Sequence, residues 1–73
     1  MAEIRVKSEL NAVLWKIEVA AGASVNAGDT LVILESMKME IPVVSPRSGT
    51  VQTILVNEGE QVAEGQPLVI LQF

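Results

Sequence analysis

Cysteine and histidine are absent from this chain, and its aromatic residues are limited to Trp15 and Phe73. Without cysteine, neither disulfides nor thiolate metal sites can support the fold. Catalytic triads that depend on His or Cys are excluded as well. The chain has 73 residues, so we expect one domain, residues 1–73. Its core must be small, because a chain of this size buries only about 60% of its unfolded surface.

Long apolar runs and clusters of positive charge are also missing. The longest aliphatic run, residues 31–34, is far shorter than the roughly 20 residues that cross a bilayer. Residues 1–7 mix charged and single apolar residues, unlike a signal peptide. Five basic residues against nine acidic ones give a net charge of −4, and the basic residues are scattered, whereas nucleic-acid binding relies on a basic patch. We therefore expect a soluble, cytoplasmic protein that binds neither membranes nor nucleic acid.

The sequence does contain an internal repeat. Sliding it against itself by 37 residues aligns eight single identities and one run of four, which is 12 of the 31 pairs from 4/41 to 34/71. Both halves carry Val-x-x-Gly-x-x-Val-x-x-Gly-x-x-Leu, over residues 19–31 and 56–68. Such a constant register indicates a duplication. Since neither half could bury an apolar face alone, the two halves should pack together.

The repeat predicts an all-β fold. The chain is rich in Val and Ile, which favour strands, and its glycines suit turns that need positive φ. Alternation around Trp15 places this residue with Val13 and Ile17 on one face, so we expect Trp15 in the core. Pro42 and Pro46 bracket residues 43–44 and favour either an edge strand or the end of a strand there. We expect two small sheets packed face to face about a pseudo-twofold axis, with strands over residues 2–7, 12–19, 30–35, 39–44, 49–55 and 67–72 and short extended segments around Val25 and Val62.

Residues 35–40, Glu-Ser-Met-Lys-Met-Glu, connect the halves and predict a tight hairpin. Such hairpins favour Asn-Gly or Asp-Gly because their central residues take positive φ, but this one offers Met and Lys. A turn that breaks the local rule indicates strain tolerated for function. We expect Lys38 on the pseudosymmetry axis at the most projecting loop. From the residues alone, Met37 and Met39 either pack over a barrel end, with Lys38 keeping the tip soluble, or are read by a partner.

The segment Leu-Glu-Ser-Met-Lys-Met-Glu-Ile-Pro, residues 34–42, resembles the attachment motif of biotinyl domains, whose core is Met-Lys-Met. The resemblance covers essentially the whole chain. It is closest to short biotin carboxyl carrier proteins of bacterial acyl-CoA carboxylases. It implies a flattened β-barrel, or sandwich, of two four-stranded antiparallel sheets, with biotin bound covalently to Lys38. The domain would be a non-catalytic carrier with no catalytic residue and no metal site.

This resemblance implies three protein partners. A biotin ligase would present activated biotin, and the Lys38 amine would attack its carbonyl to form an amide. Because only the neutral amine can attack, the ligase must supply deprotonation or desolvation. The arm would then carry a carboxyl group from biotin carboxylase to carboxyltransferase in an acyl-CoA carboxylase, namely the acetyl-CoA carboxylase of fatty acid biosynthesis. We expect the isolated carrier to be a monomer that raises the effective concentration of biotin to roughly millimolar at each site.

We assign recognition of these partners to the residues around Lys38, namely Glu35, Ser36, Met37, Met39 and Glu40. Flexible, polarisable methionines suit contact with several surfaces. The resemblance further implies that they influence carboxylation more than attachment. The two glutamates could tune docking or keep the tip soluble. A second acidic group, Glu58, Glu60 and Glu64, is interpreted as a solvated face rather than a metal cluster.

Two alternative functions remain. A lipoyl domain also modifies a hairpin lysine, but such domains usually flank it with Asp and Ala, whereas here both neighbours are Met. An unmodified barrel acting as a protein adaptor is the other alternative.

The chain lacks the Ala/Pro-rich linker and the protruding loop of some larger carriers, and its start at Met1 favours a free-standing protein over an excised fragment.

Overall fold

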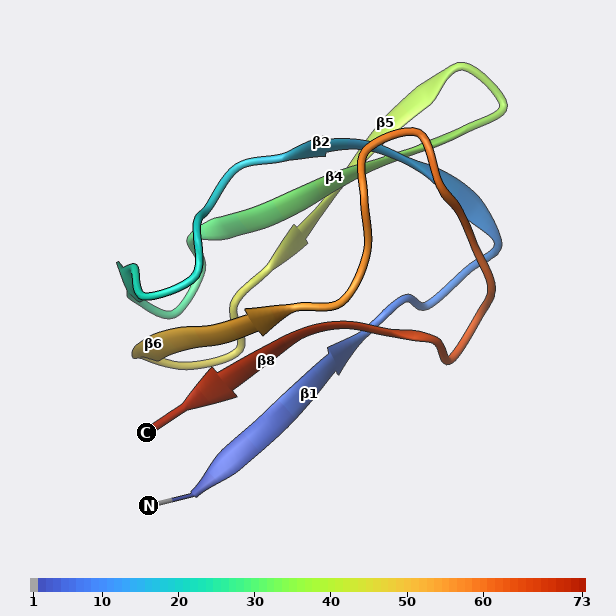
Figure 1. Cartoon of the computed structure of the whole chain (residues 1–73). Coiled ribbons are helices and arrows are strands. Elements are labelled where there is room, and N and C mark those ends of the chain that lie inside the picture. Colours follow the sequence, from blue (N-terminus) through green and yellow to red (C-terminus); the bar gives the residue numbers. More distant parts are fainter. Residues whose placement is uncertain (1) are drawn as a thin grey trace.

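The computed structural model describes residues 2–73 and consists of eight strands (Figure 1). They are β1 (Glu3–Lys7), β2 (Ala12–Ile17), β3 (Ser24–Val25), β4 (Thr30–Ser36), β5 (Met39–Val44), β6 (Gly49–Ile54), β7 (Gln61–Val62) and β8 (Pro67–Gln72). All eight predicted extended segments are present. The largest difference in bounds is at β2, which ends at Ile17 rather than at residue 19.

The strands form two four-stranded antiparallel sheets, as predicted. The terminal sheet has the order β1-β8-β6-β3, and the hairpin sheet has the order β5-β4-β2-β7. Adding 37 to every residue number converts β1 to β5, β2 to β6, β3 to β7 and β4 to β8, and therefore one sheet order into the other. Each half of the sequence supplies two strands to each sheet, so neither half could form its sheets alone. β5, which contains Pro42, is an edge strand, as its proline predicts.

The core lies between the two sheets and follows the repeat. The shared Leu-Val-Ile-Leu runs bury three side chains each with no exposed surface: Leu31, Val32 and Leu34 in one half and Leu68, Val69 and Leu71 in the other. Two buried polar residues are also symmetry mates. The Ser8 hydroxyl donates to the Leu10 carbonyl oxygen at 2.6 Å, and the Ser45 hydroxyl donates to that of Arg47 at the same distance. Both hydroxyls are therefore satisfied without an external partner.

β2 departs from the predicted alternation at Trp15. Leu14 pairs with Leu34 in β4. The next pair joins Lys16 to Ile33, so Trp15 is an extra residue without a partner, which is a β-bulge. Leu14 is fully buried, whereas the Trp15 side chain is 44% exposed. The expectation that Trp15 lies in the core is wrong, because the bulge shifts the alternation by one residue.

The second half repeats this irregularity. Val51 pairs with Leu71, and the next pair joins Thr53 to Ile70, so Gln52 is the extra residue of β6. Gln52 lies 37 positions after Trp15 and is exposed as well. The duplication therefore preserves the bulge and its outward side chain, although it does not preserve the residue type.

The hairpin tip lies at one end of an elongated molecule with extents of 37 × 18 × 17 Å. Its symmetry counterpart is the end where the chain termini meet. The pair Ser36–Met39 at the tip maps to Phe73 and Ala2, which exchange backbone hydrogen bonds of 3.0 and 2.9 Å. Figure 1 shows the tip of the β4–β5 hairpin far from the start of β1 and the end of β8. The prediction that Lys38 lies on the pseudosymmetry axis is therefore wrong, because a position on the axis would coincide with its own counterpart.

Candidate functional site

The β4–β5 hairpin closes through a two-residue turn. Its last pair joins Ser36 to Met39, which leaves Met37 and Lys38 in the turn. Their φ angles are 51° and 65°, and within residues 2–73 they are the non-glycine residues with positive φ. Positive φ at both central residues is what a type I′ hairpin turn requires. A left-handed conformation costs an L-residue roughly 1–2 kcal/mol, so the predicted conflict between turn and sequence is present.

The side chains of the turn extend into solvent. Met37 is 93% exposed and Met39 is 64% exposed, and Lys38 is exposed between them. The alternative in which the two methionines pack over a barrel end is therefore wrong. None of the side-chain hydrogen bonds within residues 2–73 involves Lys38. The hairpin thus presents a primary amine that the rest of the domain does not occupy.

Two glutamates stand side by side below the turn. Glu35 and Glu40 are directly paired across β4 and β5, and both are exposed. Alternation along the strands places Ser36 and Met39 on the opposite face of the hairpin. Like charges at directly opposite positions of an antiparallel pair are destabilising. The predicted recognition residues are therefore brought together around Lys38, with acidic side chains on one face and Ser36 and Met39 on the other.

The second acidic group has a structural role. A carboxylate oxygen of Glu58 accepts a hydrogen bond from the backbone N–H of Ile17 at 2.9 Å, and a carboxylate oxygen of Glu60 accepts one from the backbone N–H of Asn57 at 3.1 Å.

Residues 2–73 contain no group of three or more His, Cys, Asp or Glu side chains arranged to hold a metal ion. In the same part of the chain, no helix has the length and apolar character needed to span a membrane.

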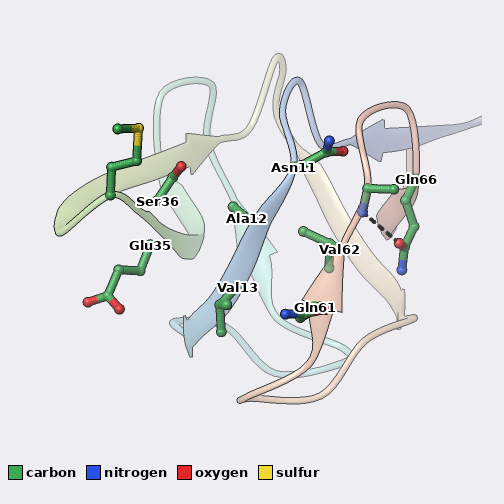
Figure 2. A pocket seen from close by; sticks show the side chains of 10 residues that line it. Asn11, Ala12, Val13, Glu35, Ser36, Gln61, Val62 and Gln66 are labelled. Atoms are coloured by element: carbon green, nitrogen blue, oxygen red, sulfur yellow. Dashed lines mark hydrogen bonds between the residues drawn. The ribbon is translucent and has the colours of Figure 1, made fainter.

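A hollow of about 680 Å³ lies beside the hairpin (Figure 2). Its lining comes from the starts of β2 and β7, the end of β4 and the loop before β8, and includes Asn11, Ala12, Ser36, Met37, Val62 and Gln66. Figure 2 shows Ser36 on the hairpin facing Ala12 on β2, with Gln66 on the far side. The residue pattern does not predict that Asn11, Ala12, Val62 and Gln66 line a site. The one signal for them is the change from Phe73 to Ser36 at equivalent repeat positions.

Known proteins resemble this chain over most of its length. A family model described as "Biotin-requiring enzyme", of biotin/lipoyl type, matches residues 5–71. The biotin/lipoyl attachment protein of Bacillus subtilis is 50% identical over 58 residues, which are 80% of each chain. A biotinylated protein, the TB7.3 homolog of Mycobacterium leprae, is 36% identical over 66 residues, 90% of this chain and 93% of its own. The dihydrolipoyllysine-residue acetyltransferase component of the pyruvate dehydrogenase complex of Cupriavidus necator is 44% identical over 57 residues, 78% of this chain and 10% of that protein.

The fold of this chain also superposes on domains of two carboxylases of known structure. A domain of a single-chain, multi-domain long-chain acyl-CoA carboxylase superposes with a TM-score of 0.91 at 30% identity and covers 96% of this chain. The urea carboxylase of Kluyveromyces lactis gives a TM-score of 0.92 at 33% identity and covers 99% of this chain. This chain spans only 7% and 6% of those two proteins. The chain therefore belongs to the family of biotin/lipoyl attachment domains of biotin-requiring enzymes.

Proposed function

We propose that this chain is a biotin carboxyl carrier in which Lys38 holds biotin through an amide bond. The observation that carries the proposal is the exposed Lys38 amine on a strained two-residue turn at one end of the molecule. The family description and the biotinylated mycobacterial relative support biotin as the covalent cofactor.

The residues present fit this group at Lys38 better than at the other two lysines. Lys38 lies in the turn between β4 and β5 and is exposed. Lys7 lies at the end of β1, and Lys16 lies within β2 with its Nζ 5.7 Å from the centre of the Trp15 ring. A partner enzyme that must enclose the amine reaches a projecting hairpin tip more easily than a side chain on the surface of a sheet. Lys38 is therefore the attachment residue that the geometry favours.

Attachment needs one bond to form and one to break. After a proton is removed from the Lys38 ammonium, its Nζ attacks the carbonyl carbon of the activated carboxyl group of biotin. The C–N amide bond forms, and the activating group leaves with the electron pair of its bond. One positive charge is lost, so the net charge of the chain changes from −4 to −5. When bound, biotin supplies a ring nitrogen that can carry a carboxyl group between two enzymes.

The barrel contributes position rather than chemistry. The left-handed turn fixes the direction in which the Lys38 arm leaves the domain, and the antiparallel pairing of β4 and β5 supports it down to the core. Met37 and Met39 offer apolar contacts on both sides of the arm, and Glu35 and Glu40 give the partner an acidic edge. We propose biotin ligase, biotin carboxylase and carboxyltransferase as the partners that read this tip.

The parent enzyme is proposed to be an acyl-CoA carboxylase, with acetyl-CoA as the acceptor. Support comes from the superposition on a domain of a long-chain acyl-CoA carboxylase. The urea carboxylase superposes equally well, which supports a carrier whose acceptor is selected by the transferase and not by the barrel. Reconstitution with carboxyltransferases for acetyl-CoA, pyruvate and urea, each with its biotin carboxylase, would identify the acceptor by the carboxylated product.

A second candidate function is that of a lipoyl carrier. The observation that favours it is the 44% identity to the dihydrolipoyllysine-bearing acetyltransferase, since a lipoyl group would use the same lysine. The two methionines beside Lys38 favour biotin, because the resemblance to biotinyl domains rests on Met-Lys-Met.

The test is the intact mass of the chain after incubation with a bacterial biotin ligase, ATP and biotin, with parallel samples given lipoate and a lipoate ligase. We expect one biotin adduct on the wild-type chain and none on Lys38→Arg, because a guanidinium stays protonated and is a poor nucleophile. A lipoyl adduct without a biotin adduct would transfer the proposal to the second candidate. No adduct on a folded chain would refute both and support the unmodified adaptor.

A further inference from the structure

The molecule has a hairpin end, at the β4–β5 turn, and a terminal end, where Ala2 pairs with Phe73. Their backbones are equivalent, but different side chains occupy them. At the terminal end, Phe73 occupies the position that Ser36 has at the hairpin end, and Arg47 occupies that of Leu10. The Arg47 guanidinium carbon lies 3.6 Å from the centre of the Phe73 ring, so two flat groups are stacked there. A Cβ built on Gly49 would lie 3.6 Å from the Phe73 Cβ, which places Phe73 against the start of β6. The end of the barrel where the termini meet thus carries the stacked Phe73 ring and Arg47 guanidinium beside the start of β6.

At the hairpin end, small residues stand at the corresponding positions. Ser36 replaces Phe73, and Ala12 at the start of β2 replaces Gly49. Between them lies the hollow of about 680 Å³ described above, which is within the range of roughly 300–1,000 Å³ found for small-molecule sites. The hairpin end therefore has a space at the place where the terminal end has a ring.

The lining of the hollow combines apolar walls with oriented amides. Its apolar lining includes Ala12, which is half-buried, and the core residue Val62, which is 4% exposed. The Asn11 side-chain oxygen accepts the Glu64 backbone N–H at 2.8 Å, and the Gln66 side-chain oxygen accepts that of Ala63 at 3.0 Å. These bonds fix both carboxamides by their oxygens and leave their NH₂ groups, each with two N–H donors, for another acceptor.

Biotin has the chemistry that such a lining would recognise. Its fused ring system is compact, with an apolar sulfur-containing ring on one side and a ureido group on the other, whose carbonyl oxygen accepts hydrogen bonds. Ser36 and Met37 line the hollow and directly precede Lys38 in the chain, so the arm on Lys38 begins at the rim of the hollow. We propose that this hollow is a resting site for the ring system of the biotin carried by Lys38, with the ureido carbonyl toward the amides of Asn11 and Gln66. This inference rests on the function proposed above.

Resting in the hollow has a consequence for transfer. The ring would be partly shielded while the carrier moves between partners, and a partner would have to draw it out. Because the hollow is open and its polar donors are few, binding must be weak enough for the ring to leave rapidly. The biotin ring would therefore exchange between a position bound in the hollow and one in which the Lys38 arm extends into solvent.

The test uses NMR spectra of the ¹⁵N,¹³C-labelled chain before and after complete loading with biotin, which intact mass verifies. We expect nuclear Overhauser contacts between the biotin ring protons and the methyl groups of Ala12 and Val62. The side-chain NH₂ signals of Asn11 and Gln66 should also shift on loading. Signals of residues 35–40 do not count, because attachment itself alters them.

Two matched variants exchange the side chains at the equivalent positions 36 and 73. Ser36→Phe places in the hollow the side chain that stands at the terminal end, and after loading with excess ligase it should lose the contacts to Ala12 and Val62. Phe73→Ser makes the reverse change at the far end and should retain them. If the loaded wild-type chain shows no ring contacts and no shifts at Asn11 and Gln66, the resting site is refuted while the carrier function stands. A chain that accepts no biotin refutes the carrier function itself, and with it this inference.

Discussion

The hairpin end and the terminal end of this barrel share one backbone pattern and differ in how the chain closes them. At the terminal end the chain is interrupted, and Ala2 and Phe73 are joined by two backbone hydrogen bonds with the Phe73 ring stacked under Arg47. At the hairpin end the chain is continuous and turns through two residues at positive φ. The duplication builds two equivalent ends, and the function that we propose belongs to the end where the symmetry is broken by strain, exposed methionines and an open hollow.

The largest effect is expected in the shared core. Leu14→Ala should lower the free energy of unfolding by about 2–5 kcal/mol, because Leu14 is fully buried next to the bulge. Trp15→Gln, which copies the repeat mate Gln52, should change it by about 1 kcal/mol or less, because Trp15 lies largely on the surface. Urea unfolding followed by circular dichroism measures both. A larger loss for Trp15→Gln than for Leu14→Ala would contradict the bulge.

A smaller effect is expected from exchanging residues between the starts of β2 and β6. A Cβ at Gly49 would lie 2.6 Å from the Gln72 carbonyl oxygen, a backbone atom that cannot move aside freely. Gly49→Ala should therefore destabilise the chain by about 1–3 kcal/mol. The matched change at the other end, Ala12→Gly, should cost only about 0.5–1 kcal/mol of backbone entropy. Equal effects in thermal unfolding would show that the two ends are packed alike.

The turn should yield a gain in stability. Met37→Asn places a residue that tolerates positive φ at the first central position and should stabilise the chain by up to about 1 kcal/mol. Met39→Asn, one residue beyond the turn in β5, is the control and should bring no gain. If Met37→Asn destabilises the chain in chemical unfolding, the positive φ of Met37 costs no conformational free energy and the turn is not strained.

The smallest structural effect is expected from replacing the methionines while keeping their volume. Met37→Leu and Met39→Leu should leave stability unchanged, because both side chains are exposed. They should slow the carboxylation of the attached biotin a few-fold, because Leu adapts less well to several partner surfaces. Carboxylation would be followed with a biotin carboxylase and labelled bicarbonate. Unchanged rates for both variants would remove the methionines from the recognition surface.

Much of the fold could be predicted because the same pattern of strands and turns occurs in both halves of the sequence. The glycine-spaced pattern located the turns, and the Leu-Val-Ile-Leu runs located the two central strands that bury most. The turn at Met37 and Lys38 was predictable because two strongly β-forming runs leave no room for a longer loop. The proline in β5 likewise indicated its edge position.

The remaining features depend on pairing in space. Trp15 was misplaced because alternation assumes that each residue has a partner, and the bulge removes that partner. Gln52 at the equivalent position was the available signal, since a polar mate indicates an outward side chain. The axis was misplaced because a connector between repeats looks central in sequence, while in space its counterpart is the pair Ala2–Phe73. The hollow depends on residues from separate strands, and the sequence shows it only as the loss of the Phe73 ring at Ser36.

The central claim is that the break in symmetry at the hairpin makes Lys38 the attachment residue. The most direct measurement is peptide mapping by tandem mass spectrometry of the wild-type chain after reaction with biotin ligase, which locates the adduct among the three lysines and the N-terminal amine. The account predicts the whole adduct on Lys38 and none on Lys7 or Lys16. Biotin on either of those lysines, with Lys38 unmodified, would contradict it.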